Sequence, residues 1–115
     1  MTQATAMLLT LVIEVPVVLA LAAARGWARG ERGTLALVAV GANLLTHPLL
    51  WFADDLLSGS LEYAPRLAVL EVLVTLAEGF VYAVPAGLGA RRGVVTSLVA
   101  NATSTAAGLA IYAFS

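Results

Sequence analysis

The sequence predicts an all-α fold, an integral membrane bundle of four transmembrane helices in a single domain, residues 1–115. Of its 115 residues 61% are hydrophobic, only 11% are charged, and the mean hydropathy is +0.95. Soluble domains carry about 25% charged residues. Four long apolar runs are separated by short polar breaks, and about 20 apolar residues suffice for one bilayer crossing. The chain contains no cysteine, which excludes disulfides and thiolate metal sites.

The first two apolar runs predict helices over about residues 4–24 and 34–53. The first ends at a segment rich in arginine and glycine, residues 25–33, which interrupts both hydropathy and helix. No positive charge precedes this run, so we expect a permanent helix and not a signal peptide. The second run ends at Asp54-Asp55, directly after two aromatic residues suited to the lipid headgroup level.

The last two runs predict helices over about residues 67–90 and 94–114. Only Arg91-Arg92-Gly93 separates them, and so short a link makes them antiparallel neighbours. The longest connection is residues 54–66, where leucines among polar residues suggest a short amphipathic turn at the interface.

The arginines predict the orientation, because cytoplasmic loops carry an excess of positive charge. There is no lysine, and the break between the second and third runs holds only Arg66. The loops after the first and third runs hold the other five: Arg25, Arg29, Arg32, Arg91 and Arg92. Both termini are therefore expected on the outer side of the membrane. We expect a multi-pass protein of the cell membrane, in a bacterial inner membrane.

Six polar residues fall inside the predicted spans, where a charged side chain at the centre costs about 2.5 to 3.5 kcal/mol. On residues 67–90, the positions of Glu71, Thr75, Glu78 and Tyr82 repeat at helical spacing and share one face. The other three helices also carry one polar face each, so we expect the faces to converge. The six residues are Glu14, Asn43, His47, Glu71, Glu78 and Asn101.

The helical rise places these residues at two depths. Glu14, Asn43 and Glu78 are expected near the midplane and Asn101 slightly to its inner side, and together they form a predicted ion- or proton-binding group. His47 and Glu71 are expected about 6 to 10 Å nearer the outer face. They form a predicted outer vestibule.

The predicted interior is acidic, with three carboxyl groups, one imidazole and no basic residue in any span. Such a cluster is neutralised by protons or by a bound cation. Proton uptake is the answer of lowest cost, a bound divalent or monovalent cation is the other, and no cofactor is predicted. Candidate metal ligands are Glu14, His47 and Glu78, although a single histidine is unlike a typical zinc site. The alternative is structural: protonated glutamates that hydrogen-bond across helices.

Three functions remain open. The first is a small carrier or channel coupled to cations or protons. The second is a non-catalytic subunit of a larger membrane complex, and the third is an intramembrane enzyme for a lipid-like substrate. The chain carries no glycine-rich phosphate loop, no His-Glu-x-x-His pair and no Gly-x-Ser-x-Gly elbow, which disfavours an enzyme. Expected partners are the lipid bilayer and either further copies of the chain or another membrane subunit, and no nucleic acid.

Two resemblances accompany these hypotheses. Four spans with a glutamate in the first, Ile13-Glu14-Val15, are superficially similar to small multidrug resistance transporters, which implies proton exchange at a buried glutamate. A wider pattern resembles small uncharacterised bacterial four-helix membrane proteins, for which it implies no activity. That pattern comprises Glu14-x-Pro16, Asn43-x-x-Thr46-His47-Pro48, Glu71 with Glu78, and Ser97-Leu98-x-x-Asn101-x-x-Ser104.

Overall fold

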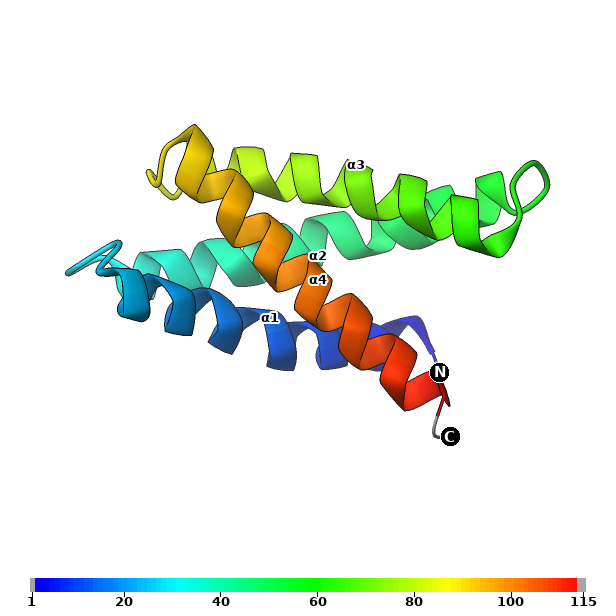
Figure 1. Ribbon diagram of the computed structural model, residues 1–115, viewed down its shortest axis with the longest axis horizontal. Coiled ribbons are helices and arrows are strands. Elements are labelled where there is room, and N and C mark those ends of the chain that lie inside the picture. The colour runs from blue at the N-terminus through cyan, green and yellow to red at the C-terminus, as the bar shows by residue number, and fades with distance from the viewer. Residues whose placement is uncertain (1, 114–115) are drawn as a thin grey trace.

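The structure is a computed structural model that describes residues 2–113, and the helix end expected at residue 114 lies outside them. The described chain is all-helical and contains no strand, which confirms the predicted class. It forms an elongated bundle of 45 × 27 × 20 Å (Figure 1). Its elements are α1 (Gln3–Arg25), α2 (Arg32–Leu57), α3 (Tyr63–Ala83) and α4 (Ala90–Ala113).

The ends of α1 follow from local hydrogen bonding and lie close to the predicted ones. At its start, the Thr2 side chain accepts a hydrogen bond from the backbone N–H of Thr5 at 3.1 Å. At its end, Gly26 adopts a left-handed conformation with φ of 71°, in which its N–H returns to the last turn. Glycine enters this conformation without the steric cost that other residues bear, so the helix stops there.

Helix α2 is longer than predicted, because Asp54 and Asp55 do not end it and it continues to Leu57. Asp54 accepts a charged hydrogen bond from Nε of Arg66 at 2.7 Å. This pair ties the last turns of α2 to the start of α3. The predicted amphipathic connection of residues 54–66 is thereby reduced to residues 58–62.

Helix α3 is shifted relative to the predicted 67–90, since it begins at Tyr63 and ends at Ala83. Pro85 explains the early end, because proline has no N–H and disfavours helix in the residue before it. Gly87 and Gly89 follow with φ of 75° and 85°, and the N–H of Gly89 bonds back to the carbonyl of Ala83 at 3.0 Å. The chain therefore turns at residues 84–89.

The connection between α3 and α4 therefore differs from the predicted Arg91-Arg92-Gly93. Those three residues already lie in the first turn of α4, which begins at Ala90 and not at residue 94. The two helices are nevertheless neighbours, because they pack directly against each other. Gly93 lies at their crossing: a Cβ atom there would stand 2.6 Å from the Ala83 nitrogen and 2.7 Å from the Gly79 oxygen.

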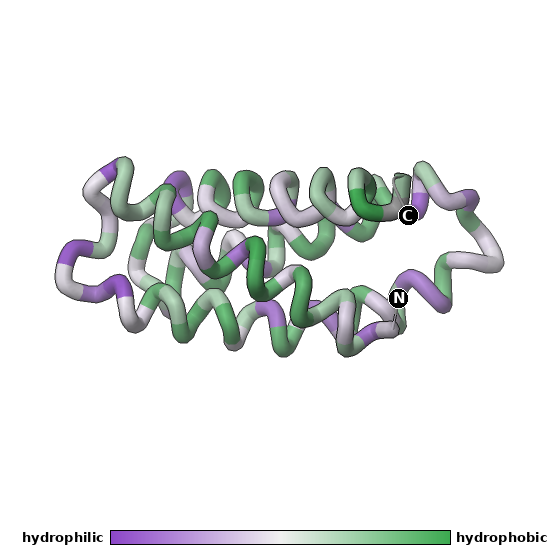
Figure 2. The backbone as a smooth tube through the Cα atoms, turned by 90° about the horizontal axis from the view of Figure 1, so that it is seen from below, coloured by the Kyte–Doolittle hydropathy of each residue, from purple (hydrophilic) through white to green (hydrophobic). Residues whose placement is uncertain are grey.

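Among the described residues, three helices are long and apolar enough to cross a membrane, namely α1, α2 and α4. Every 18-residue window of α3 contains Arg66, Glu71 and Glu78, which sets that helix apart. Along the backbone, hydrophilic positions gather in the loops at the two ends of the bundle and recur singly within the helices (Figure 2). This distribution is compatible with a membrane location.

The four helices pack as a ring: each helix lies against two neighbours, and no Cα atoms of the diagonal pairs approach within 8 Å in the described chain. Helix α4 runs diagonally across the bundle, away from the end of α3 and towards the start of α1 (Figure 1). The bundle therefore has two unlike halves. We call the half with the arginine-bearing loops the closed half; its buried apolar core is Val18, Ala22, Leu35, Ala39, Tyr82 and Ala100. The half with the N-terminus and residues 58–62 is the open half.

Candidate functional site

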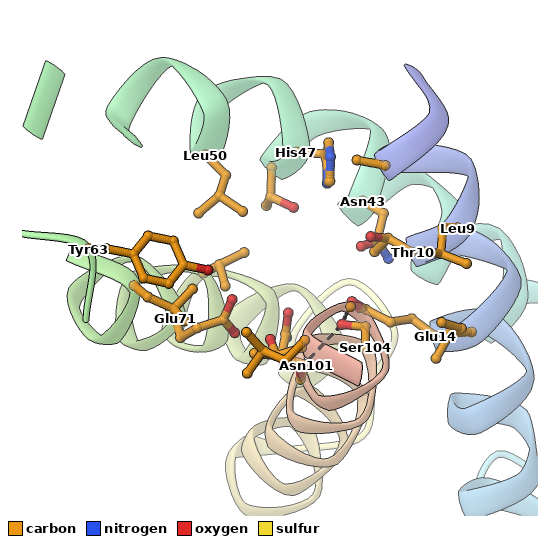
Figure 3. Close-up of a pocket in the computed structure, with 18 residues that line it drawn as sticks. Leu9, Thr10, Glu14, Asn43, His47, Leu50, Tyr63, Glu71, Asn101 and Ser104 are labelled. Carbon is orange, nitrogen blue, oxygen red and sulfur yellow. Dashed lines mark hydrogen bonds between the residues drawn. The ribbon is translucent and has the colours of Figure 1, made fainter. Parts of the chain in front are cut away.

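A pocket of about 350 Å³ occupies the open half and is lined by all four helices (Figure 3). It extends from Glu14 and Asn101, at mid-bundle, to Leu50 and Tyr63, in the C-terminal part of α2 and at the start of α3. Five of the six predicted site residues line it: Glu14, Asn43, His47, Glu71 and Asn101. The sixth, Glu78, does not.

Glu14 lies at the inner end of the pocket, with only 1% of its surface exposed. The hydroxyl of Ser104 on α4 donates a hydrogen bond to its Oε2 atom at 2.6 Å. Its Oε1 atom is buried and has no hydrogen-bond partner among the described residues. Most buried polar atoms are paired. The Asn43 side chain of α2 lies close enough to act on the Glu14 carboxyl, although it makes no hydrogen bond of good geometry with Oε1.

Glu78 lies behind the pocket and is fully buried, at 0% exposure. Thr46 on α2 donates to its Oε2 atom at 2.8 Å, and the Asn101 amide on α4 donates to its Oε1 atom at 2.7 Å. Both donors belong to residues that line the pocket. Glu78 is thus joined to the pocket through the side chains of two neighbouring helices.

The two asparagines have different partners. The Asn101 amide nitrogen also donates to the carbonyl oxygen of Ser97 at 2.9 Å, which leaves Asn101 anchored to its own helix while it reaches Glu78. The Asn43 amide nitrogen donates to the carbonyl oxygen of Ala39 at 2.9 Å. Asn101 therefore links α4 to α3 by a hydrogen bond, whereas Asn43 donates within α2 and its side chain also faces the Glu14 carboxyl of α1.

His47 and Glu71 line the part of the pocket nearer its outer end (Figure 3). The indole Nε1 of Trp51 donates a hydrogen bond to Nε2 of His47 at 3.0 Å. Nε2 is therefore the unprotonated nitrogen, and the neutral imidazole carries its hydrogen on Nδ1. From the sequence, Trp51 was expected only as an aromatic residue at the headgroup level, so this contact is an addition.

The three candidate metal ligands, Glu14, His47 and Glu78, do not form one ligand group among the described residues. Within residues 2–113, no set of three or more histidine, aspartate or glutamate side chains is placed to hold a metal ion. Glu78 is separated from the pocket by its own hydrogen-bond donors, and Nε2 of His47 already accepts from Trp51. These candidates therefore do not meet around one point within residues 2–113.

The pocket is acidic and has no basic counterpart. Its lining includes Glu14 and Glu71 and no arginine, and the carboxyl groups of both lie within electrostatic range of Glu78. Carboxyl groups this close cannot all ionise at low cost in a buried setting. The site is therefore suited to take up protons or a positively charged ligand.

Two apolar grooves adjoin the pocket along the sides of α3. The groove between α2 and α3 measures about 210 Å³ and shares Thr46 with the pocket. The groove between α3 and α4 measures about 430 Å³ and shares Glu71 and Thr105 with it. Side chains of the pocket thus also face the outer surface of the bundle.

No family model, curated protein or solved structure matches this chain. The site therefore stands on its geometry alone. Sequence reasoning missed Thr46 as a partner of Glu78 and Ser104 as the donor to Glu14. Helical spacing assigns a residue to a face, whereas these pairs depend on how far one helix is shifted along another.

Proposed function

We propose that this chain spans a bacterial inner membrane four times and acts as a small carrier coupled to protons or cations. The pocket of the open half is its binding site, and Glu14 is the group that exchanges a proton for a positively charged ligand. The observation that carries the proposal is the buried Oε1 atom of Glu14, unpartnered at the wall of an acidic pocket. A cation or a proton supplies the missing partner.

The asymmetry of the bundle favours a carrier over an open channel. The pocket reaches mid-bundle, whereas the closed half is packed around Tyr82 and the Gly93 crossing. A carrier exposes its site to one side at a time by shifting one part of the bundle against another. Glu78, held by Thr46 and Asn101, couples the site to two helices that take part in such a shift.

Transport is tested with protein reconstituted in liposomes, by following proton flux with a pH-sensitive dye and Na⁺, K⁺ and Mg²⁺ flux with ion-selective dyes. We expect flux in the wild type and none in Glu14→Gln or Glu78→Gln. Glu62→Gln is the matched control, because Glu62 is exposed before α3 and makes no capping hydrogen bond. Absence of all four fluxes, or unchanged flux in Glu14→Gln, would refute the proposal.

The proposed topology places both termini outside, and its test exploits the lack of cysteine in the chain. Single cysteines are introduced at Ser60, in the loop between α2 and α3, and at Glu31, in the loop between α1 and α2. A membrane-impermeant maleimide applied to intact cells is expected to label Ser60→Cys only. Labelling of Glu31→Cys instead would reverse the orientation.

A second candidate is a subunit of a larger membrane assembly, favoured by the two apolar grooves beside α3. A helix of a partner subunit or of another copy would fill them and complete the wall of the pocket. Purification from the native membrane in mild detergent distinguishes the cases. A stoichiometric second protein would favour the subunit, and particles made of this chain alone would favour a carrier that is monomeric or homo-oligomeric.

A further inference from the structure

Five of the six arginines gather at the end of the closed half, where the loop after α1 lies beside the start of α4 (Figure 1). None of these five forms an ion pair within the described residues, since the ion pair found there joins Arg66 to Asp54 at the opposite end. Residues 25–33 and 84–93 contain one carboxyl group, that of Glu31. Positive charge is therefore concentrated at one end of the bundle.

Two of these arginines approach one aromatic ring from different helices. Cζ of Arg25, the last residue of α1, lies 6.0 Å from the centre of the Trp27 ring. Cζ of Arg92, in the first turn of α4, lies 5.4 Å from the same centre. Both distances are those of cation–π contacts. Trp27 is partly buried and packs against the apolar core of the closed half, so the ring is a fixed platform for the two guanidinium groups.

A third guanidinium group lies against the residue that precedes Trp27. A Cβ atom at Gly26 would stand 3.2 Å from Nη2 and 3.5 Å from Nε of Arg29. Because Gly26 has no side chain, it leaves this space to the arginine. In addition, Nε of Arg32, the first residue of α2, is buried and has no hydrogen-bond partner among the described residues.

This arrangement favours the binding of an anion. Guanidinium groups stay charged at physiological pH and repel one another where they gather. Helices α2 and α4 also begin at this end without an acidic residue in the first turn, so the positive ends of their dipoles strengthen the field. A planar guanidinium group can donate to two oxygens of one phosphate at once. A phosphate group therefore supplies the negative charge that the chain lacks here.

We propose that Arg25, Arg29 and Arg92, arranged around Trp27, bind the phosphate of an anionic membrane phospholipid. The proposal is independent of transport, but it rests on the proposed membrane location and on the orientation of this end towards the cytoplasm. Tryptophan rings are typical of the headgroup level of a bilayer. Lipid phosphates lie at that level, and the cytoplasmic leaflet carries anionic lipids that attract basic residues. This position favours a lipid over a free phosphate ion.

The opposite end of the bundle does not share these properties. Residues 54–66 contain Asp54, Asp55 and Glu62, and their single arginine, Arg66, is already bound to Asp54 at 2.7 Å. We therefore expect the anionic lipid at the arginine-bearing end only. A lipid that binds the folded protein there also stabilises it.

Lipid preference is measured by fluorescence quenching with brominated lipids. The chain has two tryptophans, so the Trp51→Phe protein reports on Trp27 alone. It is reconstituted in mixed bilayers of phosphatidylglycerol and phosphatidylcholine, with either lipid brominated. We expect preferential quenching by phosphatidylglycerol, and a preference about tenfold lower after Arg25→Gln or Arg92→Gln, the effect of losing one charged hydrogen bond. Equal quenching by the two lipids would overturn the site.

Arg91→Gln is the matched control. It removes the same charge from the same turn of α4, but Arg91 is exposed and, among the described residues, makes no cation–π contact with Trp27. We expect Arg91→Gln to keep the preference for phosphatidylglycerol. Equal losses in Arg91→Gln and Arg92→Gln would indicate diffuse attraction to a charged surface and would overturn the discrete site.

Thermal unfolding in a zwitterionic detergent distinguishes the two sources of phosphate. We expect phosphatidylglycerol to raise the Tm of the wild type and to have little effect on Arg92→Gln. Inorganic phosphate should not raise the Tm above that in potassium chloride of the same ionic strength. A rise with inorganic phosphate would identify a site for a soluble anion and overturn the lipid assignment. Neither measurement involves transport, so the lipid site and the proposed carrier can fail separately.

Discussion

The closed and open halves of the bundle are built from the same four helices, yet they differ in what their interiors contain. In the closed half apolar side chains pack around Tyr82, and at Gly93 the backbone of α4 lies directly on that of α3. In the open half α4 has moved away from α3 towards α1, and a pocket of about 350 Å³ lies between polar side chains (Figure 1). Close contact thus joins α3 and α4 at one end, and their divergence leaves the pocket at the other.

The boundary between the halves is formed by the Glu78 hydrogen bonds. Thr46 and Asn101 reach Glu78 from α2 and α4, and Ser97 donates to the carbonyl oxygen of Thr75 at 2.7 Å. Beyond this layer, towards the termini, α4 is joined to α1 through Ser104 and Glu14. Helix α4 is therefore hydrogen-bonded to α3 at mid-bundle and to α1 beyond it. Substitutions in either half test whether the two halves differ in this way.

The largest expected effect comes from Gly93→Ala, which breaks the closed half. The added methyl group meets backbone atoms of Gly79 and Ala83 at under 3 Å, and backbone has no alternative rotamer with which to yield. Overpacking of this kind costs about 3 kcal/mol of unfolding free energy. Thermal unfolding in detergent measures it, with Gly41→Ala as the control, because nothing lies within 4 Å of a Cβ at Gly41. Equal Tm values would show that the contact at Gly93 is not as tight as its backbone distances indicate.

Asn101→Ala should have the next largest effect, because it breaks the boundary layer. Glu78 keeps the bond from Thr46 but loses the donor to Oε1, and a buried acceptor left without a partner costs about 2 kcal/mol. The same unfolding measurement applies, with Thr103→Val as a control on the exposed side of α4. A loss no greater than that of the control would show that water replaces the amide.

Trp51→Phe probes the outer part of the open half and should cost about 1 kcal/mol, the usual value of one hydrogen bond. It frees Nε2 of His47 while keeping an aromatic ring at the position. The imidazole resonances in NMR spectra of ¹⁵N-histidine-labelled protein should shift with the loss of this donor. Unchanged resonances would contradict the tautomer assigned to His47.

The smallest expected change in stability is that of Glu14→Gln, because the amide oxygen still accepts from Ser104 and the side chain keeps its shape. We expect Glu14→Gln to abolish ligand exchange at the pocket of the open half and to leave the fold intact. Unfolding and flux measured on the same preparation separate the two. Strong destabilisation would instead mean that the Glu14 carboxyl has a structural role.

Several features of the candidate site were predicted from particular residues. The i, i+4, i+7 and i+11 spacing from Glu71 to Tyr82 placed that polar face correctly towards the interior, and five of the six predicted residues line one pocket. The separation of Glu78 from that pocket was not predictable. It depends on hydrogen-bond donors from α2 and α4. The position of these helices along α3 cannot be read from the residue spacing within one helix.

By itself, the sequence determined the all-α class, the number of helices and the polar face of each, because hydropathy and the helical period are properties of consecutive residues. It also placed the ends of α1 within a residue or two, where Gly26 supplies a local stop. Only the tertiary structure decided which half is closed. That outcome depends on where α4 approaches α3, at Gly93, and where it leaves α3 for α1, at Glu14. Contacts between segments far apart in the sequence produce no periodic pattern of residues from which they could be predicted.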